Sequence, residues 1–374
     1  MLSEAQSGVR DAVRSFAQEQ IRPRSVEFET AGGYPAALFL ELAGIGLMGM
    51  MAPERFGGAD ADCVSYALAL MELAAADGAL STIVSIQNSI MVSGLLKDGT
   101  PAQQLRFLPD LIGGRVIGGF ALTEADAGTD ARAIRTRAAK VEGGWLLNGS
   151  KQFITSGKLA GLMMVIAVSD TASEKKGMSA FLVPTDRKGY FVDKIEHKLG
   201  QGASDTCAIR FENLFVEDDL VLGTVGRGYG IALANLEAGR IGIAAQSVGM
   251  AQAALDIAIG YAKERKSMGK TIIHHQAVGF RLADLAAKLE AARQLVIYAA
   301  DLKDSGKPCL KEASMAKLVA SETAELVCSG AMQTLGGYGY LEEFGIAKIY
   351  RDVRVAQIYE GTSDVQRMVI ARTL

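Results

Sequence analysis

The chain has 374 residues, a hydrophobic fraction of 49%, a charged fraction of 22% and a formal net charge of −3. This composition is typical of a soluble globular protein with a large core, and the length predicts two or three substructures. The acidic balance, without a long basic run, argues against a dedicated nucleic-acid-binding protein. The scattered cysteines predict buried thiols in a reducing compartment, and with only three histidines no metal site is expected: Cys63, Cys207, Cys309 and Cys328.

The N-terminal segment and the apolar stretches predict a cytoplasmic protein. Residues 1–23 mix acidic and basic residues on an amphipathic helix, without the apolar core of a signal peptide or the acid-free character of a transit peptide. Charges or glycines interrupt the apolar stretches before they reach the roughly eighteen residues of a membrane span. We therefore expect no membrane segment.

Three regions of different texture follow one another along the chain. Residues 1–117 are rich in Ala, Leu, Glu and Met, and the breakers "TAGGYP", "ERFGGAD" and "LIGGR" predict several helices with short loops. Residues 118–223 show short apolar runs between turns, which predicts a β domain built as a small barrel or sandwich. Residues 224–374 return to long helical periods and predict an antiparallel four-helix bundle. The predicted fold class is therefore α+β, with an N-terminal helical domain, a middle β domain and a C-terminal bundle.

The strand signals of the middle region lie in four stretches. "LMMVIAVSD", "MSAFLVPT" and "AIRFENLFV" each have the length and apolar content of one strand. Asn148-Gly149, between apolar runs in "WLLNGSKQFIT", is the strongest short-range signal for a β-hairpin. We expect a tight turn at these two residues.

Helical periodicity is clearest in the last region. Apolar residues from Ile241 to Ala262, and again from Val278 to Val296, recur at steps of three and four, with a break at "MGKTIIHH" between the two runs. A third helix is predicted from about Lys311 to the glycines of "LGGYGY".

Two segments of the middle region could bind a flat polar ligand. "FALTEADAGTD" (120–130) combines backbone amides with the hydroxyls of Thr123 and Thr129, although taken alone it is more simply a turn. "KQFIT" places Phe153 and Thr155 two apart, hence on one strand face, where a ring and a hydroxyl could meet a heterocycle. Most such strands are merely half-buried. Neither a G-x-G-x-x-G motif nor a P-loop is present.

Two helix ends in the last region also allow two interpretations. Arg265 in "YAKERKSMGK" could donate paired hydrogen bonds to a pyrophosphate, or could simply complement the helix dipole. Gly336-Gly337 in "QTLGGYGY" could form a helix C-cap or permit the close approach of a ligand.

The segment "IYEGTSDVQ" joins a carboxylate to the start of a helix. Ser363 and Gln366 fit a capping box, which predicts a helix beginning there. That cap requires neither Glu360 nor Gly361. Glu360 is therefore a candidate general base as well as part of the lead-in to a helix.

In this order and over essentially the whole chain, these five segments resemble the acyl-CoA dehydrogenase family. The similarity is greatest to short-chain and short-branched-chain members, through "GRIGIAAQSVGMAQAALD", "GKPCLKEASMAKLVASE" and "IYEGTSDVQR". The resemblance implies a helical domain, a β domain and a four-helix bundle, which matches the three textures, and it implies FAD as the cofactor.

The resemblance also implies a site that two subunits share. FAD would be contacted within its own subunit by residues of the middle region and of the last helix: Phe120, Leu122, Thr123, Thr129, Phe153, Ile154, Thr155, Thr362, Ser363 and Asp364. The FAD of a neighbouring subunit would be contacted by a second set, which implies an oligomer, usually a homotetramer: Arg265, Ser267, Gln276, Gln333, Gly336 and Gly337. The acyl-CoA substrate would be contacted by Thr129, Glu237, Arg240 and Gly361.

The implied reaction is the α,β-dehydrogenation of a short or short-branched acyl-CoA to trans-2-enoyl-CoA. Glu360 would remove the α-proton while the β-hydride passes to flavin N5, and burial beside the substrate would raise its pKa toward the operating range. The electrons would then pass to an electron-transferring flavoprotein. Some family members carry the base immediately before the residue that matches Arg240. Gly239 occupies that position here and has no side chain, so Glu360 has no rival.

Some positions depart from the family pattern. Gly202 stands where relatives usually carry Arg, and Asp205 stands where a small hydroxyl residue is common, which puts the charge interactions of that loop in doubt. Met268 replaces a usual Phe and should still pack apolarly. Ala125 replaces a usual Pro.

Other functions remain open on the sequence. An acyl-CoA oxidase-like relative would pass its electrons to O₂, and oxygen access is not visible in a sequence. Desulfinase-type relatives lack the glutamate that is present here. A non-enzymatic flavin- or DNA-binding relative would carry a basic C-terminal extension, whereas this sequence is acidic and ends at "VIARTL".

Overall fold

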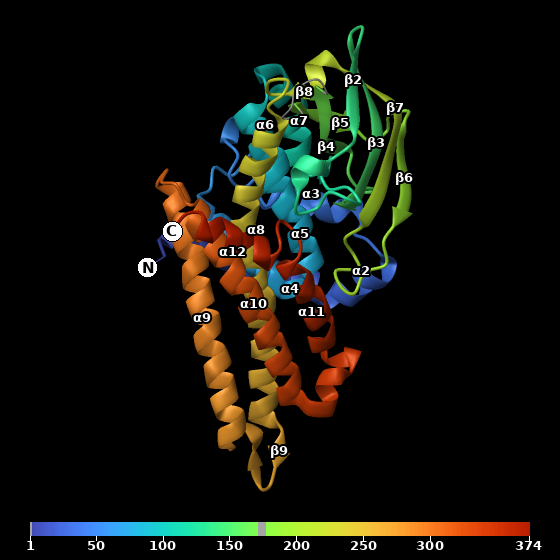
Figure 1. The fold of residues 1–374 in the computed structure, drawn as a ribbon. Coiled ribbons are helices and arrows are strands. Elements are labelled where there is room, and N and C mark those ends of the chain that lie inside the picture. The colour runs from blue at the N-terminus through green and yellow to red at the C-terminus, as the bar shows by residue number, and fades with distance from the viewer. Residues whose placement is uncertain (1, 171–176) are drawn as a thin grey trace.

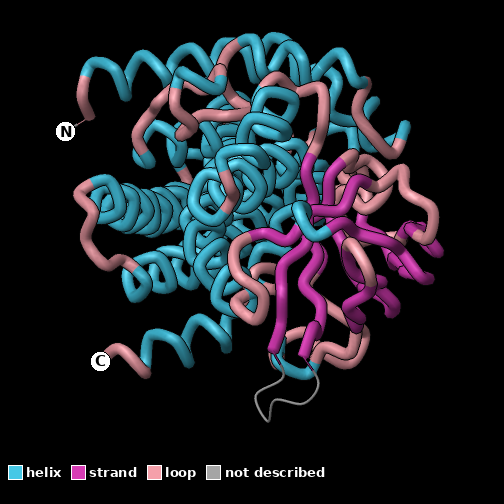
Figure 2. Tube along the Cα trace, turned by 90° about the horizontal axis from the view of Figure 1, so that it is seen from above, coloured by secondary structure: helices cyan, strands magenta, loops and turns pink. Residues whose placement is uncertain are grey.

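The structure, a computed structural model, describes residues 2–170 and 177–374, and its elements run in the order helices, sheet, helices (Figure 1). Seen from above, the strands gather on one side of the molecule and the helices fill the other (Figure 2). The predicted α+β class is confirmed. The domain boundaries after residues 117 and 223 stay a prediction, with β1 beginning at Gly118 and α8 at Gly228.

The N-terminal part is helical, and glycines and acidic caps separate its helices. Gly32, with φ of 67°, ends one helix in the left-handed conformation that glycine adopts without strain. Asp62 and Asp77 cap α4 and α5 by accepting from the amides of Ser65 and Leu80. The α-helices of this part are α1 (Glu4–Phe16), α2 (Ser25–Ala31), α3 (Ala36–Gly44), α4 (Cys63–Ala76), α5 (Gly78–Ile86), α6 (Ser93–Asp98) and α7 (Pro101–Ile112).

The apolar stretches are longer than predicted from the sequence, because two helices of the described residues have the length and composition of a membrane span. They are Gly78–Asp98 and Gly228–Glu264, and 89% and 83% of their most apolar windows are buried within the protein. Both stretches contain several small or polar residues such as Gly and Ser, but their mean hydropathy still reaches that of a membrane span. Such burial is typical of the core helices of a globular protein.

The described strands of the middle region form one sheet, in the order β6-β7-β3-β2-β4-β5-β8, with β1 parallel to β4. β2 and β4 pair through a single residue pair, Arg137 with Val168, so the sheet consists of two halves joined at a narrow seam. The strands are β1 (Gly118–Ala121), β2 (Arg137–Val141), β3 (Gly144–Thr155), β4 (Leu162–Asp170), β5 (Gly177–Pro184), β6 (Tyr190–Ile195), β7 (Thr206–Glu217) and β8 (Val221–Leu222). Three of them, β4, β5 and β7, confirm the strands predicted from the sequence.

The hairpin predicted at Asn148-Gly149 is wrong. Both residues lie inside β3, which runs on to Thr155, and the register against β7 shifts between Leu147 and Gly149. A Cβ atom on Gly149 would lie 2.6 Å from Thr136 Oγ1. The glycine is therefore explained by a close approach of two strands at a bulge and not by a turn.

The C-terminal part contains three long helices with shorter ones packed against them. α8 (Gly228–Glu264), α9 (Gln276–Asp304) and α10 (Leu310–Leu335) confirm the predicted periodic runs, and the short hairpin of β9 (Lys266–Ser267) and β10 (Lys270–Thr271) connects α8 to α9. α11 (Ile346–Val353) and α12 (Ser363–Ala371) both contact α10. Helix α4 of the N-terminal part also packs against α8, so one apolar core runs through both helical regions. The four cysteines are free and buried, as predicted.

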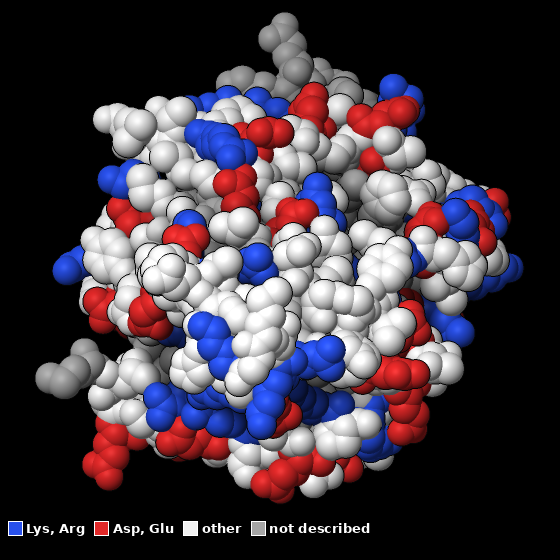
Figure 3. Space-filling model, turned by 90° about the horizontal axis from the view of Figure 1, so that it is seen from below, with Lys and Arg blue, Asp and Glu red and all other residues white. Residues whose placement is uncertain are grey.

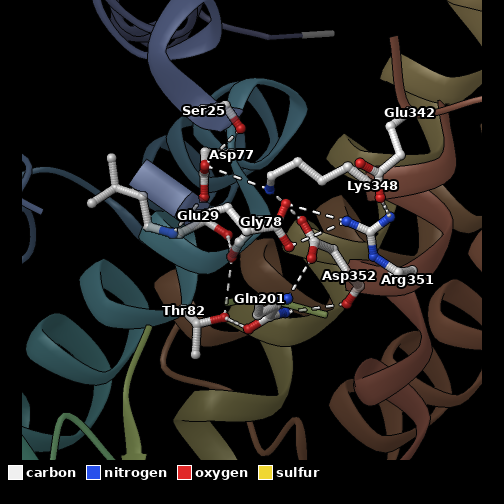
Figure 4. A network of polar contacts seen from close by, with 12 residues as sticks. Ser25, Glu29, Asp77, Gly78, Thr82, Gln201, Glu342, Lys348, Arg351 and Asp352 are labelled. Atoms are coloured by element: carbon white, nitrogen blue, oxygen red, sulfur yellow. Dashed lines mark hydrogen bonds and ion pairs between the residues drawn. The ribbon is translucent and has the colours of Figure 1, made fainter. Parts of the chain in front are cut away.

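A buried polar network joins these regions (Figure 4). Lys348 Nζ on α11 lies 2.6 Å from the carboxylate of Asp352 and 3.7 Å from that of Asp77. Asp77 also accepts from the hydroxyl of Ser25 at 2.8 Å. Asp352 accepts from the backbone amide of Gln201, in the loop between β6 and β7. This network thus joins three helices, α2, α5 and α11, to the loop between β6 and β7.

Candidate active site

Glu360 lies in a short irregular segment between the 3₁₀ turn Arg354–Gln357 and α12. Its backbone is left-handed, with φ of 52°, and Gly361 follows with φ of 94°. A left-handed conformation is uncommon for a residue with a side chain and persists only where the surroundings hold it. The carboxylate oxygen Oε2 of Glu360 is buried and has no hydrogen-bond partner. It is therefore available to accept a proton.

Lys317 on α10 holds this segment from one side. The residue is 1% exposed, and its Nζ atom donates to the carbonyl of Tyr359 at 2.7 Å and to the carbonyl of Gly361. These two carbonyls stand on either side of Glu360. Lys317 was not predicted as a site residue. Its signal in the sequence is a lysine at helical spacing from Ala313 and Ala320, on an otherwise small and apolar face.

Helix α8 also lies against this carboxylate. A Cβ atom placed on Gly239 would lie only 2.1 Å from Glu360 Oε2, so no side chain fits at this position beside the carboxylate. The next residue, Arg240, is buried, and its Nε and Nη1 atoms have no hydrogen-bond partner. Glu237 lies one turn earlier on the same helix.

Burial and charge together set the ionisation of this group of residues. Burial raises the pKa of Glu360 to about 7, although the positive charges of Lys317 and Arg240 act to lower it. Burial lowers the pKa of Lys317 to about 8, with Glu360 opposing that effect. Burial also lowers the pKa of Arg240, against Glu237 and Glu360. Glu360 therefore titrates near neutral pH.

The predicted capping box is wrong by one residue. Thr362 is the N-cap of α12, and its hydroxyl accepts from the amide of Val365 at 3.3 Å. Ser363 is already helical, and its buried hydroxyl has no partner. Gln366 instead donates from Nε2 to the carbonyl of Gly361 at 2.9 Å, so it restrains the base segment directly.

The loop predicted to line the cofactor is fixed against β3. Lys151, 1% exposed, donates from Nζ to the carbonyl of Leu122 at 2.8 Å and to the carboxylate of Glu124 at 2.9 Å. The carbonyl of Thr123 accepts from the amide of Gln152 at 2.9 Å. Residues 122–124 of the loop are therefore anchored to the end of β3 as one unit.

The residues of this unit that were predicted to bind FAD differ in how far their side chains are exposed. The register of β3 shifts next to Phe153, whose φ is 58°, so the simple alternation assumed for Phe153 and Thr155 is interrupted. Phe153 is 63% exposed, whereas Ile154 and Leu122 are buried in the core. Only the main chain of these two residues could face a ligand. Thr129 is exposed and Phe120 is partly buried.

The residues predicted to reach a neighbouring subunit form a separate group. Arg265, at the C-terminal end of α8, lies with its guanidinium carbon 5.8 Å from the ring centre of Tyr338, which follows α10. Arg265 is 25 residues after Arg240, about 37 Å along the helix axis at 1.5 Å per residue. The other members of this group lie at the same end of the long helices, around β9 (Figure 1): Ser267, Gln276, Gln333, Gly336 and Gly337. Within one chain, this group does not meet the group around Glu360.

The surface at this end is distinctive. Viewed from below, Lys and Arg side chains gather beside a broad patch of uncharged residues (Figure 3). Met268, in the turn of the β9–β10 hairpin, is 91% exposed. The apolar packing predicted for Met268 is therefore not made within the chain.

Two departures from the family pattern have local explanations. The carboxylate of Asp205 accepts from the backbone amides of Lys158 and Leu159 at 3.0 and 3.1 Å, so it caps the turn after β3. A Cβ atom on Gly202 would lie 2.9 Å from the side chain of Glu29, which is paired with Arg351. A larger residue at position 202 would meet that ion pair.

Comparison with known proteins shows the family of the chain. The profiles of the N-terminal, middle and C-terminal domains of acyl-CoA dehydrogenases match residues 3–115, 119–214 and 226–374. The human mitochondrial short-chain specific acyl-CoA dehydrogenase is 41% identical over 370 residues, which is 99% of this chain and 90% of that protein. The CarC subunit of the caffeyl-CoA reductase–Etf complex of Acetobacterium woodii is 41% identical over 373 residues, 100% and 98% of the two chains. The structure of butyryl-CoA dehydrogenase from Megasphaera elsdenii has a TM-score of 0.97 at 38% identity, covering 100% of this chain and 98% of that one.

Together, the fold and the buried carboxylate define an oxidoreductase of the flavoprotein class. The chain belongs to the acyl-CoA dehydrogenase family, and its substrate class is an acyl-CoA. Among the residues that the structure describes, no group of three or more His, Cys, Asp or Glu is placed to hold a metal ion.

Proposed function

We propose that this protein uses FAD to dehydrogenate short-chain acyl-CoA thioesters to trans-2-enoyl-CoA, with Glu360 as the general base. The observation that carries this proposal is the carboxylate of Glu360. One of its oxygens is buried without a hydrogen-bond partner, next to Gly239, where the absence of a side chain leaves room for it. Hydrogen bonds hold the residues before and after Glu360 in place.

The environment of Glu360 suits the removal of a weakly acidic proton. A thioester α-proton requires a base whose pKa is near the operating pH and whose position is fixed. Burial raises the pKa of Glu360 to about 7, so the carboxylate is both ionised and basic near neutrality. Negative charge that develops on the substrate would be stabilised by nearby buried donors, and the guanidinium of Arg240, with two unpartnered nitrogens, is such a group.

The residues present fit a flavin. Exposed Phe153 lies near the end of β3, and the loop that carries Thr123 is bonded to the same strand by Lys151 and Gln152. The buried Ser363 hydroxyl at the start of α12 has no partner within the chain, and a helix N-terminus favours a polar or anionic group. FAD bound there would accept the hydride from the substrate β-carbon. Thr155, Thr362 and Asp364 complete the set that we assign to FAD in the same subunit.

A homotetramer in the cytoplasm, with an electron-transferring flavoprotein as electron acceptor, completes the proposal. The group around Arg265 lies too far from Glu360 to complete the same site in one chain, which supports a site shared between two copies. The similarity to a subunit of an Etf complex supports the acceptor. The similarity to short-chain and butyryl-CoA dehydrogenases supports butyryl-CoA as substrate. A short branched acyl-CoA is the other substrate that we propose from the sequence.

The substrate is tested by anaerobic bleaching of the bound flavin with acyl-CoAs of graded length and branching. We expect fast bleaching with four-carbon thioesters and slower bleaching as the chain lengthens. Fast bleaching by long-chain substrates alone would contradict the short-chain assignment. Subsequent admission of O₂ separates the alternatives, because rapid reoxidation of the reduced enzyme with formation of peroxide would identify an oxidase.

A further inference from the structure

We propose that Lys317 is the positioning residue of the catalytic base: its buried ammonium group holds the carbonyl groups of the residues before and after Glu360 and thereby fixes the carboxylate against Gly239. This inference rests on the proposed role of Glu360 as the base. Lys317 lies on α10, remote in sequence from Glu360, and would maintain the geometry of the proton transfer.

The hydrogen bonds define this role. An ammonium group has three protons to donate, and Lys317 Nζ directs two hydrogen bonds to the carbonyls of Tyr359 and Gly361. Glu360 lies between these two anchor points. Its left-handed φ of 52° is a conformation that a residue with a side chain adopts only under constraint. Lys317 supplies a constraint that acts at once on the peptide group leading into Glu360, through the carbonyl of Tyr359, and on the peptide group that follows Gly361.

Other contacts restrain the ends of the segment but do not replace Lys317. Gln366 donates to the carbonyl of Gly361, on the C-terminal side of the base. On the N-terminal side, the hydroxyl of Tyr359 donates to Gln246 of α8. The carbonyl of Tyr359 is held by Lys317. Loss of Lys317 would therefore free the peptide that leads directly into the base.

The charge of Lys317 gives it a second effect on the base. A buried ammonium group is costly unless hydrogen bonds or an opposite charge compensate it. The groups that face Lys317 and Glu360 from the surrounding elements are Arg240 on α8 and the phenols of Tyr66 on α4 and Tyr359. The positive charge of Lys317 lowers the pKa of Glu360 against the effect of burial.

The test compares Lys317→Met and Lys317→Gln with Lys311→Met, a control at a partly exposed lysine on the same helix. Anaerobic flavin reduction by butyryl-CoA is followed across pH in the FAD-loaded enzyme. In Lys317→Met and Lys317→Gln we expect retained FAD, a rate lowered by about tenfold to a hundredfold through misplacement of the base, and an acid limb of the pH profile shifted to higher pH. The shift follows because the charge that lowers the pKa of Glu360 is lost. Lys311→Met should match the wild type.

Two results would overturn the inference. One is a wild-type rate and acid limb in both Lys317 variants. The other is a rate lowered equally at all pH values with an unmoved acid limb, which would show that Lys317 only packs the helix. If Lys317→Met does not fold, the rate and the acid limb of Lys317→Gln test the inference instead, because glutamine keeps a neutral hydrogen-bond donor. If neither variant folds with FAD, the inference is overturned in favour of a structural role. Failure of the proposed function is distinct, because Glu360→Gln would then keep full flavin reduction.

Discussion

At the scale of single residues, the site depends on the absence of a side chain at position 239. Glu360 Oε2 occupies the space where a Cβ atom of residue 239 would lie, at 2.1 Å. The carboxylate is the flexible end of its side chain, so an added methyl group would displace the base and leave the helix intact. The position of the Glu360 carboxylate therefore requires glycine at position 239.

We predict that Gly239→Ala lowers the rate of flavin reduction by about a hundredfold, since a displacement of about 1 Å can have that effect. The stability should not fall, because alanine in a helix interior is favoured over glycine by roughly 0.5–1 kcal/mol. Gly260→Ala is the matched control, since nothing lies within 4 Å of a Cβ atom at that position of the same helix. Thermal unfolding and stopped-flow bleaching measure the two effects. A wild-type rate in Gly239→Ala would show that the carboxylate does not act from this position.

A second prediction concerns pH. The base is active as the carboxylate, and its pKa is raised to about 7. Flavin reduction should therefore be half-maximal near pH 7, level off about one pH unit above that value, and approach a tenfold decrease per pH unit well below it, for loss of a single required ionisation. Stopped-flow bleaching with butyryl-CoA at saturating concentration measures the profile. A rate that stays constant down to about pH 5 would mean that the carboxylate has its ordinary pKa.

At the scale of elements, local patterns predicted the long helices and three strands, β4, β5 and β7, but not the details that depend on tertiary contacts. Helices α8 and α9 follow from apolar periodicity, and the end of α10 follows from the glycines of "LGGYGY". The hairpin at Asn148-Gly149 failed because a glycine serves a close strand approach as well as a turn, and only the proximity of Thr136 distinguishes them. The cap of α12 was misplaced because Thr362 and Ser363 are both good N-cap residues.

Site residues were predictable to the extent that a resemblance to a family carried them. Glu360 and Gly239 were predicted, but their contact was not, because residues 121 positions apart meet only through packing. Lys317 was missed because helical periodicity indicates that a lysine is buried, but not which carbonyl groups it meets.

The buried network around α11 gives an element-scale prediction. Burial alone would lower the pKa of Lys348, but Asp77 and Asp352 outweigh it and raise that pKa above its ordinary value. Lys348→Met would leave two buried carboxylates without their cation, and we expect a loss of about 3–5 kcal/mol in the free energy of unfolding. Lys288→Met removes a lysine from an exposed pair with Asp284 at the same four-residue spacing, and should cost less than about 0.5 kcal/mol. Urea unfolding of both variants measures the difference. Equal stability of the two would show that the network does not hold α11 in place.

At the scale of the whole molecule, the account requires two copies of the chain for each complete site. Phe280, one turn after Gln276 on α9, is 68% exposed at the end where the second group of residues lies. We predict that Phe280→Asp lowers the mass of the assembly and its FAD content together. Leu105→Asp on α7, where the native side chain is 69% exposed, is the matched control and should change neither. Light scattering with absorbance at the flavin bands measures both quantities. A dissociated Phe280→Asp protein that kept all of its FAD would show that the site is complete in one chain.

The position of Glu360 depends on contacts with several parts of the fold. Its segment meets α10 through Lys317 and α8 through Gly239, and the tyrosine before it reaches Gln246 on α8. Through the buried network, the N-terminal helices and the sheet fix the preceding helix α11.

The central claim, that Glu360 is the base of an acyl-CoA dehydrogenase, is tested most directly by mixing butyryl-CoA anaerobically with the FAD-loaded wild type and with Glu360→Gln. The glutamine keeps the size of the side chain and cannot accept the proton. We predict that the wild-type flavin bleaches rapidly and that the variant retains its FAD but bleaches more slowly by a factor of about 10²–10⁴ or more. Bleaching of Glu360→Gln at the wild-type rate would contradict the claim.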